Sequence, residues 1–176
     1  FPFDENVAKT RQVVELAACG AESLGYSGQG WDSDNMLFAC GNGVIDLTTG
    51  KLRLGAGGDF IKTASPVVYN GIDEVAPYWE EFLCSAFDDS TIVDYLQRFL
   101  GYCLTGETRD HVLTVFFGKR GRNGKSVLLR VLGHVMGSFY RKIPSGLLLT
   151  RYNAHGKSDA ARENVVFQGL RLAFAS

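Results

Sequence analysis

The feature that most constrains this chain is a run of strand, glycine-rich loop and helix in its C-terminal third. Residues 112–117, Val-Leu-Thr-Val-Phe-Phe, are mostly β-branched or aromatic and uncharged, which predicts a buried parallel strand. A loop over residues 118–126 follows directly. Apolar residues then recur at helical spacing until Gly137, at positions 127, 128, 131, 132, 135 and 136. The pattern predicts an α/β arrangement in which the loop joins a strand to a helix.

The residues of this loop predict a site for phosphate groups. Unpaired N–H groups at a helix start, together with the helix dipole, attract phosphate oxygens, and glycines let the backbone approach them closely. We expect Lys125 to reach the β- and γ-phosphates of a nucleotide and the Ser126 hydroxyl to occupy one position on a magnesium ion. Asn123 is expected to brace the loop.

The loop is one residue longer than the usual P-loop pattern, because Lys119 stands where the first glycine is normally found. Two interpretations stay open: Gly118 begins a longer loop, or Gly121 carries the turn. The strand before the loop and the helix after it favour phosphate binding over a purely structural glycine loop. The predicted nucleotide-binding residues, with Lys125 and Ser126 as the catalytic pair and Ser126 as the metal ligand, are Gly118, Gly121, Arg122, Asn123, Gly124, Lys125, Ser126 and Val127.

The charge of the chain changes sign just before this strand. Residues 1–108 carry 6 basic and 16 acidic side chains, whereas residues 109–176 carry 12 and 3, although the net charge of the whole chain is only -1. The first part therefore repels phosphate and the second attracts it. We take this change as a domain boundary between residues 108 and 109.

The acidic part predicts a small mixed α+β domain. Residues 5–18 favour a helix that stops near Gly20, and residues 36–40 a strand followed by a turn at 41–43. Residues 44–47 and 51–54 flank a short glycine-ended connection typical of a hairpin. Residues 61–69, interrupted by Pro66, are expected to add an edge strand.

Two amphipathic helices are predicted to follow. Pro77 suits the first turn of one helix, and Asp89 or Ser90 caps the other, which Gly106 closes. We interpret both aromatic stripes as core. The first stripe consists of Trp79, Phe82, Leu83, Ala86 and Phe87, and the second of Ile92, Tyr95, Leu96, Phe99, Leu100 and Cys103.

Composition restricts the setting of the chain. No stretch approaches the roughly 18 apolar residues of a membrane span, and no targeting signal precedes residue 20. The spacing of Cys19, Cys40, Cys84 and Cys103 fits no zinc pattern, so we expect reduced core cysteines of an intracellular protein. Because the chain begins at Phe1 and ends on an apolar run, we expect a fragment of a longer protein.

Several segments together resemble the primase-helicase proteins of phages, plasmids and large DNA viruses, whose ATPase belongs to the superfamily 3 helicases. Residues 96–106, Leu-Gln-Arg-Phe-Leu-Gly-Tyr-Cys-Leu-Thr-Gly, are the most specific part. The hairpin Asn-Gly-Val-Ile-Asp-Leu at 42–47, the helix at 78–83 and the loop at 121–126 are also similar to this family. The remaining similar segments are 31–32, 49–50, 144–149 and 169–176.

The resemblance implies an α/β fold: a mixed α+β leader domain over 1–108 and a P-loop, AAA+-like, parallel-sheet ATPase core over 109–176, truncated at the Walker B strand. It implies an ATP-dependent replicative DNA helicase that uses ATP and Mg²⁺, forms a homo-oligomeric ring, commonly a hexamer, and threads single-stranded or forked DNA. The acidic pair, sensor and arginine finger of the family are expected after Ser176, so we expect residues 1–176 alone to hydrolyse ATP poorly. A phage- or plasmid-encoded protein of this kind acts in the host cytoplasm, away from membranes.

Two other functions stay open at this stage. The loop alone also fits a P-loop kinase of small molecules, and the fragment also fits a non-enzymatic assembly or DNA-docking module. Basic residues between the post-loop helix and the last strand fit either a DNA-facing surface or a solvated one. They are Arg141, Lys142, Arg151, Lys157 and Arg162, while Lys119, Arg120 and Arg122 are placed to contact nucleotide or a neighbouring subunit.

Overall fold

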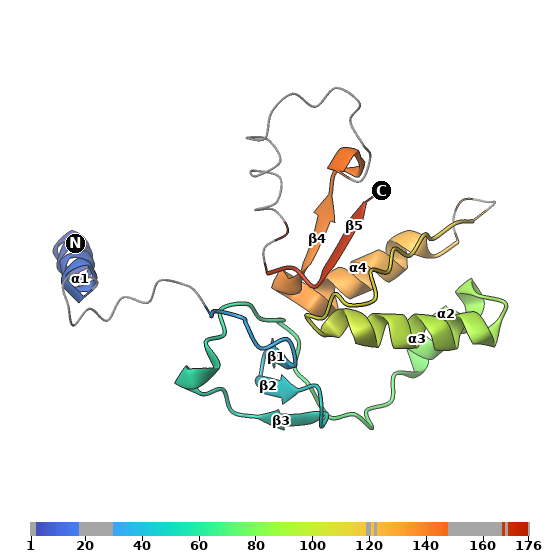
Figure 1. Cartoon of the computed structure of the whole chain (residues 1–176), viewed down its shortest axis with the longest axis horizontal. Coiled ribbons are helices and arrows are strands. Elements are labelled where there is room, and N and C mark those ends of the chain that lie inside the picture. Colours follow the sequence, from blue (N-terminus) through green and yellow to red (C-terminus); the bar gives the residue numbers. More distant parts are fainter. Residues whose placement is uncertain are drawn as a thin grey trace. The chain divides into compact units, whose positions relative to one another are not determined.

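The computed structural model describes residues 3–17, 30–118, 121, 123–147, 167 and 169–175. The chain forms two compact units, Phe1–Trp31 and Asp32–Ser176, each considered by itself (Figure 1). The first contains helix α1 (Phe3–Ala17), where a helix was predicted. Its predicted stop at Gly20 lies outside the described residues. The second unit is a mixed α+β structure with two small sheets.

The predicted hairpin is confirmed as part of a three-stranded antiparallel sheet. Its strands are β1 (Leu37–Cys40), β2 (Gly43–Asp46) and β3 (Lys51–Arg53), paired in that order. Asp46 closes the second turn, since its carboxylate accepts a hydrogen bond from the Thr48 N–H at 2.8 Å. That bond lowers the pKa of Asp46, as expected for a carboxylate bound to backbone donors.

The predicted edge strand at 61–69 is not formed as a strand. The segment nevertheless lies along the free edge of β1, because the Ser65 N–H donates to the Ala39 carbonyl at 2.9 Å and the Gly41 N–H to the Val67 carbonyl at 2.8 Å. Pro66 interrupts a regular ladder because it has no N–H to donate. The buried Ser65 hydroxyl also donates to the Val135 carbonyl at 2.5 Å, which ties the segment to the next layer.

Both amphipathic helices are confirmed. They are α2 (Pro77–Ala86), with proline at its start, and α3 (Ser90–Leu104), whose N-cap Asp89 accepts from the Thr91 N–H at 2.8 Å. One part of the stripe prediction is wrong, since Ile92 and Tyr95 are exposed. The buried side of α3 is rotated toward Val93, so the side chains that enter the cores are Val93, Leu96, Phe99, Leu100 and Cys103.

Helix α4 (Lys125–Met136) packs against these elements and confirms the helix predicted after the loop. One core joins Leu83 of α2 and Leu96 of α3 to Leu128 and Leu132 of α4. A second core joins the sheet to the end of α4, through Phe38, Ile45, Cys103, Met136 and Phe139. Side chains from both sides of the predicted domain boundary between residues 108 and 109 share these cores. The boundary itself stays a prediction.

The second sheet pairs β4 (Tyr140–Ile143) with β5 (Leu172–Ala175) in parallel. The predicted buried strand at 112–117 is wrong. Leu113, Val115 and Phe117 are 75%, 77% and 83% exposed, and no described residue bonds to the backbone of this segment. A strand exists only through hydrogen bonds to a neighbour, and within the described chain no strand pairs with this segment.

The described cysteines, Cys40, Cys84 and Cys103, are all free thiols. Cys103 is a core residue, and burial raises the pKa of its thiol to about 11. The core prediction is wrong for Cys84, which is exposed, and Cys19 lies outside the described residues. Within the described segments, no helix is long and apolar enough to cross a membrane and no cluster of metal-ligating side chains is found.

An ion pair beyond β3 gives a pH-dependent contribution to stability. The Arg53 guanidinium contacts both carboxylate oxygens of Asp59 at 2.8 Å, and the Ala56 N–H donates to the same carboxylate. These bonds lower the pKa of Asp59 from 3.8 to about 2.

We expect Asp59→Asn to lower the free energy of unfolding by a constant amount above pH 3.8 and by progressively less as pH falls toward about 2. Urea unfolding of both proteins across this range measures the difference; a gap that does not shrink on acidification would contradict it.

Candidate functional site

The start of α4 presents free backbone donors next to the glycine-rich loop. Gly124 is the N-cap residue, with φ of 80°, a conformation that glycine adopts readily. Its carbonyl accepts the N–H groups of Val127 at 3.0 Å and Leu128 at 2.9 Å. The N–H groups of Lys125 and Ser126 make no bond within the described residues. A helix start of this kind binds anions well.

The lysine at this helix start is held by the loop itself. The Lys125 ammonium donates to the Asn123 Oδ1 at 2.7 Å, as expected from the bracing role predicted for Asn123. A methyl group added to Gly118 would overlap the Asn123 amide nitrogen and lie 3.2 Å from the Lys125 Nζ. One added to Gly121 would meet nothing within 4 Å. Asn123 and Lys125 therefore lie against Gly118, whereas a side chain on Gly121 would have open space.

The structure brings together four of the predicted site residues: Gly118, Asn123, Gly124 and Lys125. Ser126 and Val127 follow in the first turn of α4, both exposed. Arg122, Lys119 and Arg120 lie outside the described residues.

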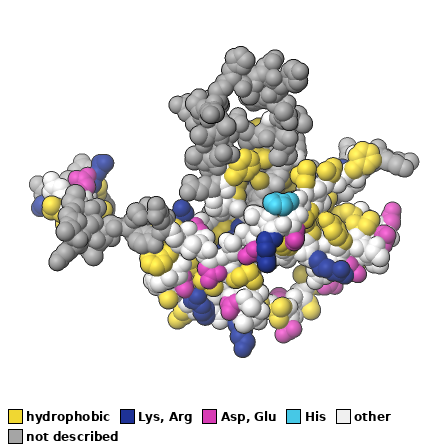
Figure 2. All heavy atoms as spheres, viewed as in Figure 1, with side chains coloured by type: hydrophobic (Ala, Val, Ile, Leu, Met, Phe, Trp, Pro, Cys, Tyr) yellow, Lys and Arg dark blue, Asp and Glu magenta, His cyan; other side chains and the backbone are white. Residues whose placement is uncertain are grey.

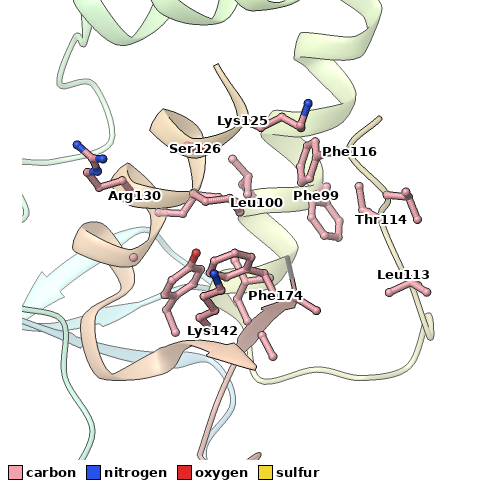
Figure 3. Close-up of a pocket in the computed structure, with 18 of the residues that line it drawn as sticks. Phe99, Leu100, Leu113, Thr114, Phe116, Lys125, Ser126, Arg130, Lys142 and Phe174 are labelled. Atoms are coloured by element: carbon pink, nitrogen blue, oxygen red, sulfur yellow. The ribbon is translucent and has the colours of Figure 1, made fainter. Parts of the chain in front are cut away.

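A cavity of about 780 Å³ lies beside this helix start (Figure 3). Lys125 and Ser126 line one part of it, residues 112–116 form another wall, and β4 and β5 form a third. Among the described residues, its charged lining side chains are Lys125, Arg130 and Lys142, with no aspartate or glutamate. The lining is thus largely apolar with three basic groups, which suits an anionic ligand that also carries an apolar part.

Two hydroxyl groups on the cavity wall are buried without a hydrogen-bond partner in the described structure. They belong to Thr114 and Tyr140. Burial also raises the pKa of Tyr140 to about 12, so this phenol stays protonated at neutral pH. Both groups are therefore able to donate a hydrogen bond to an occupant of the cavity.

One contact to the loop is not visible in the sequence. A methyl group added to Gly124 would lie 3.2 Å from the ring of Phe82 and 3.4 Å from the side chain of Ala86, both on α2. The apolar stripe of α2 indicated core residues, but the spacing does not distinguish a side chain that packs on Leu128 from one that packs on the loop.

The predicted DNA-facing basic residues are only partly described. Arg141 and Lys142 lie exposed on β4, and Lys142 stands 5.8 Å from the ring centroid of Phe174. Arg151, Lys157 and Arg162 lie outside the described residues. On the face shown in Figure 2, the coloured Lys and Arg side chains are scattered among Asp and Glu.

Comparisons with known proteins match both parts of the chain. Residues 6–88 match the family described as "D5 N terminal like". Over 143 residues, or 80% of its length, the chain is 30% identical to a protein of Acanthamoeba polyphaga mimivirus that is named as a putative helicase. Because the match covers 80% of the 176 residues, it spans the loop at 118–126 wherever it begins. The chain spans 15% of the length of that relative.

Proposed function

Because the chain belongs to the primase-helicase family of phages and large DNA viruses, we propose that its 118–126 loop binds ATP and that the parent protein unwinds DNA with the energy of ATP hydrolysis. The observation that carries the proposal is the arrangement around Lys125. Its ammonium is held by Asn123 at the start of α4, beside N–H groups that are free within the described residues. This combination of a cation with unpaired backbone donors is suited to a triphosphate.

Each residue of the site has a distinct task. The N–H groups of Lys125 and Ser126 donate to phosphate oxygens, and the Lys125 ammonium exchanges its bond to Asn123 for one to the β- and γ-phosphates. The Ser126 hydroxyl, exposed at the first turn, would hold magnesium, and the metal would supply positive charge against the phosphates. Gly118, Gly121, Arg122, Gly124 and Val127 complete the proposed phosphate-binding backbone.

The surrounding elements fit the start of a P-loop ATPase core. The parallel pair of β4 and β5 and the packing of α4 beneath it support this fold assignment. The parent protein is then a ring of identical subunits around single-stranded or forked DNA, acting in the host cytoplasm. Positive charge in residues 109–176 supports contact with phosphate, from nucleotide, DNA or both.

Titration of the 176-residue chain with ATP, with and without Mg²⁺, tests the proposal by calorimetry. We expect binding that magnesium strengthens. For the parent protein, single-stranded DNA should stimulate ATP turnover. Turnover that instead requires a small hydroxyl compound would indicate a kinase, and DNA binding without any nucleotide binding would indicate a docking module.

The two glycines of the loop are expected to differ in their tolerance of a side chain. Gly118→Ala places a methyl group on the Asn123 amide and close to the Lys125 ammonium, so we expect ATP affinity to fall by about tenfold, a typical size for a displaced charged contact. Gly121→Ala is the matched control, because its methyl group meets nothing within 4 Å and leaves the backbone N–H in place, so affinity should change less than about twofold. Equal affinities in the two variants would show that Gly118 does not close the site.

A further inference from the structure

We propose that helix α2 sets the backbone conformation of the phosphate loop through Phe82, which acts as a positioning residue for nucleotide binding. This inference rests on the proposed function, because it concerns regulation of the same site. Phe82 itself is not placed to contact ATP. It acts on Gly124, the residue that precedes Lys125 and Ser126.

Gly124 is closely approached by two side chains of α2, those of Phe82 and Ala86. Two ring carbons of Phe82 lie 3.2 Å, and the Ala86 methyl 3.4 Å, from the position that a side chain on Gly124 would occupy. Gly124 also accepts the first hydrogen bonds of α4 from Val127 and Leu128. A shift of the Phe82 ring therefore changes the direction of the N–H groups that follow Gly124.

Phe82 is itself held in place by its own helix. Trp79 stacks on it, with ring centroids 5.4 Å apart and planes inclined by 29°. The adjacent Leu83 is buried against α3 and α4, so α2 is anchored independently of the loop. Because packed side chains of this kind move together, the position of α2 and the geometry of the loop are coupled.

This coupling is reciprocal. If α2 holds the loop in the conformation that binds phosphate, then bound phosphate also holds α2. Nucleotide binding at the start of α4 is thereby coupled to the positions of α2 and α3, the two helices that precede it in the chain. Trp79 stacks on Phe82, so we expect its fluorescence to report on the loop.

Binding of Mg²⁺-ATP to Phe82→Ala, compared with Leu83→Ala, tests the proposal. Both substitutions remove a large side chain from α2, but only Phe82 faces Gly124. We expect Phe82→Ala to weaken ATP binding by about tenfold, within the usual range of coupling between sites. Leu83→Ala is expected to lower thermal stability and leave affinity within about twofold. If the alanine variants do not fold, Phe82→Leu and Leu83→Val form the corresponding milder pair.

A spectroscopic measurement accompanies the affinities. In a Trp31→Phe background Trp79 is the remaining tryptophan, and we expect its emission to change on addition of Mg²⁺-ATP. The change should be lost in Phe82→Ala even at saturating nucleotide. Unchanged affinity in Phe82→Ala, or equal weakening in the Leu83 variant, would overturn the coupling. If the unsubstituted chain binds no nucleotide, the proposed function itself fails.

Discussion

Replacing Lys125 by alanine is expected to weaken ATP binding by about a hundredfold. The substitution removes the only loop cation in the described residues that stands at the start of α4, and hydrogen bonds to charged groups contribute about 1.5–3 kcal/mol each. The loss should be largest for ATP and smallest for AMP, because the ammonium is expected to reach the β- and γ-phosphates. Calorimetric titration with ATP, ADP and AMP measures this order.

The same substitution should leave the fold intact. The helix dipole repels a cation at a helix N-terminus. Removal of the Lys125 charge relieves this repulsion, and the stability gained offsets the loss of the hydrogen bond to Asn123. Lys62→Ala is the matched control, because Lys62 is an exposed lysine that does not line the cavity. If Lys125→Ala binds ATP like the unsubstituted chain, or if Lys62→Ala loses as much affinity, the assignment of the loop is wrong.

Replacing Arg171 by alanine is expected to give a large loss of stability, about 3–5 kcal/mol, because two hydrogen bonds from a half-buried charged group are lost and each contributes about 1.5–3 kcal/mol. The Arg171 guanidinium lies 4.6 Å from the ring centroid of Phe139 and 5.7 Å from that of Phe38. It donates to the Leu37 carbonyl at 2.7 Å and to the Leu104 carbonyl. One side chain thus joins β1, the end of α3 and the start of β5.

Burial and neighbouring charges shift the pKa of Arg171 in opposite directions. Desolvation lowers the pKa of Arg171, while the nearby carboxylates of Asp32 and Asp34 raise it. The guanidinium remains charged, because an arginine pKa starts far above neutral pH. Its loss therefore strands two carbonyl groups and removes a stacked cation from two aromatic rings.

Urea unfolding measures the effect of Arg171→Ala, and two further variants show its cause. Arg171→Lys keeps the charge but lacks the planar fork that reaches two carbonyls, so we expect it to recover less than half of the loss. Arg130→Ala, at an exposed position of α4, should change the free energy of unfolding by less than about 0.5 kcal/mol. Full recovery by lysine would show that charge alone, without the two carbonyl contacts, stabilises this junction.

Elements fixed by local chemistry were predictable from the sequence. The hairpin of β2 and β3 follows from its glycine-ended connection, and α2 and α3 from a proline start, an Asp89 cap and apolar spacing. Helix α4 begins directly after Gly124, as the loop pattern requires. Each of these signals involves residues within about one or two turns of one another, so the sequence contains them in full.

Elements that depend on distant partners were not predictable. Residues 112–117 have the composition of a buried strand, but no strand of the described chain pairs with them, so Leu113, Val115 and Phe117 stay exposed. Residues 61–69 lie along β1 without forming a strand, since Pro66 interrupts the bonding. Ile92 and Tyr95 were assigned to the core, but Val93 packs instead on the core that α2, α3 and α4 share.

By itself, the sequence determined the kind of site this protein carries: a glycine loop, a lysine and a serine at the start of a helix, because these residues are contiguous and their chemistry is local. Only the tertiary structure shows that Asn123 lies against Gly118 and not against Gly121, and that Phe82 of α2 packs on Gly124. It also decided that Arg171 joins β1 to α3, across 134 and 67 positions of sequence. Contacts over such separations arise from the packing of whole elements, which no local pattern of residues specifies.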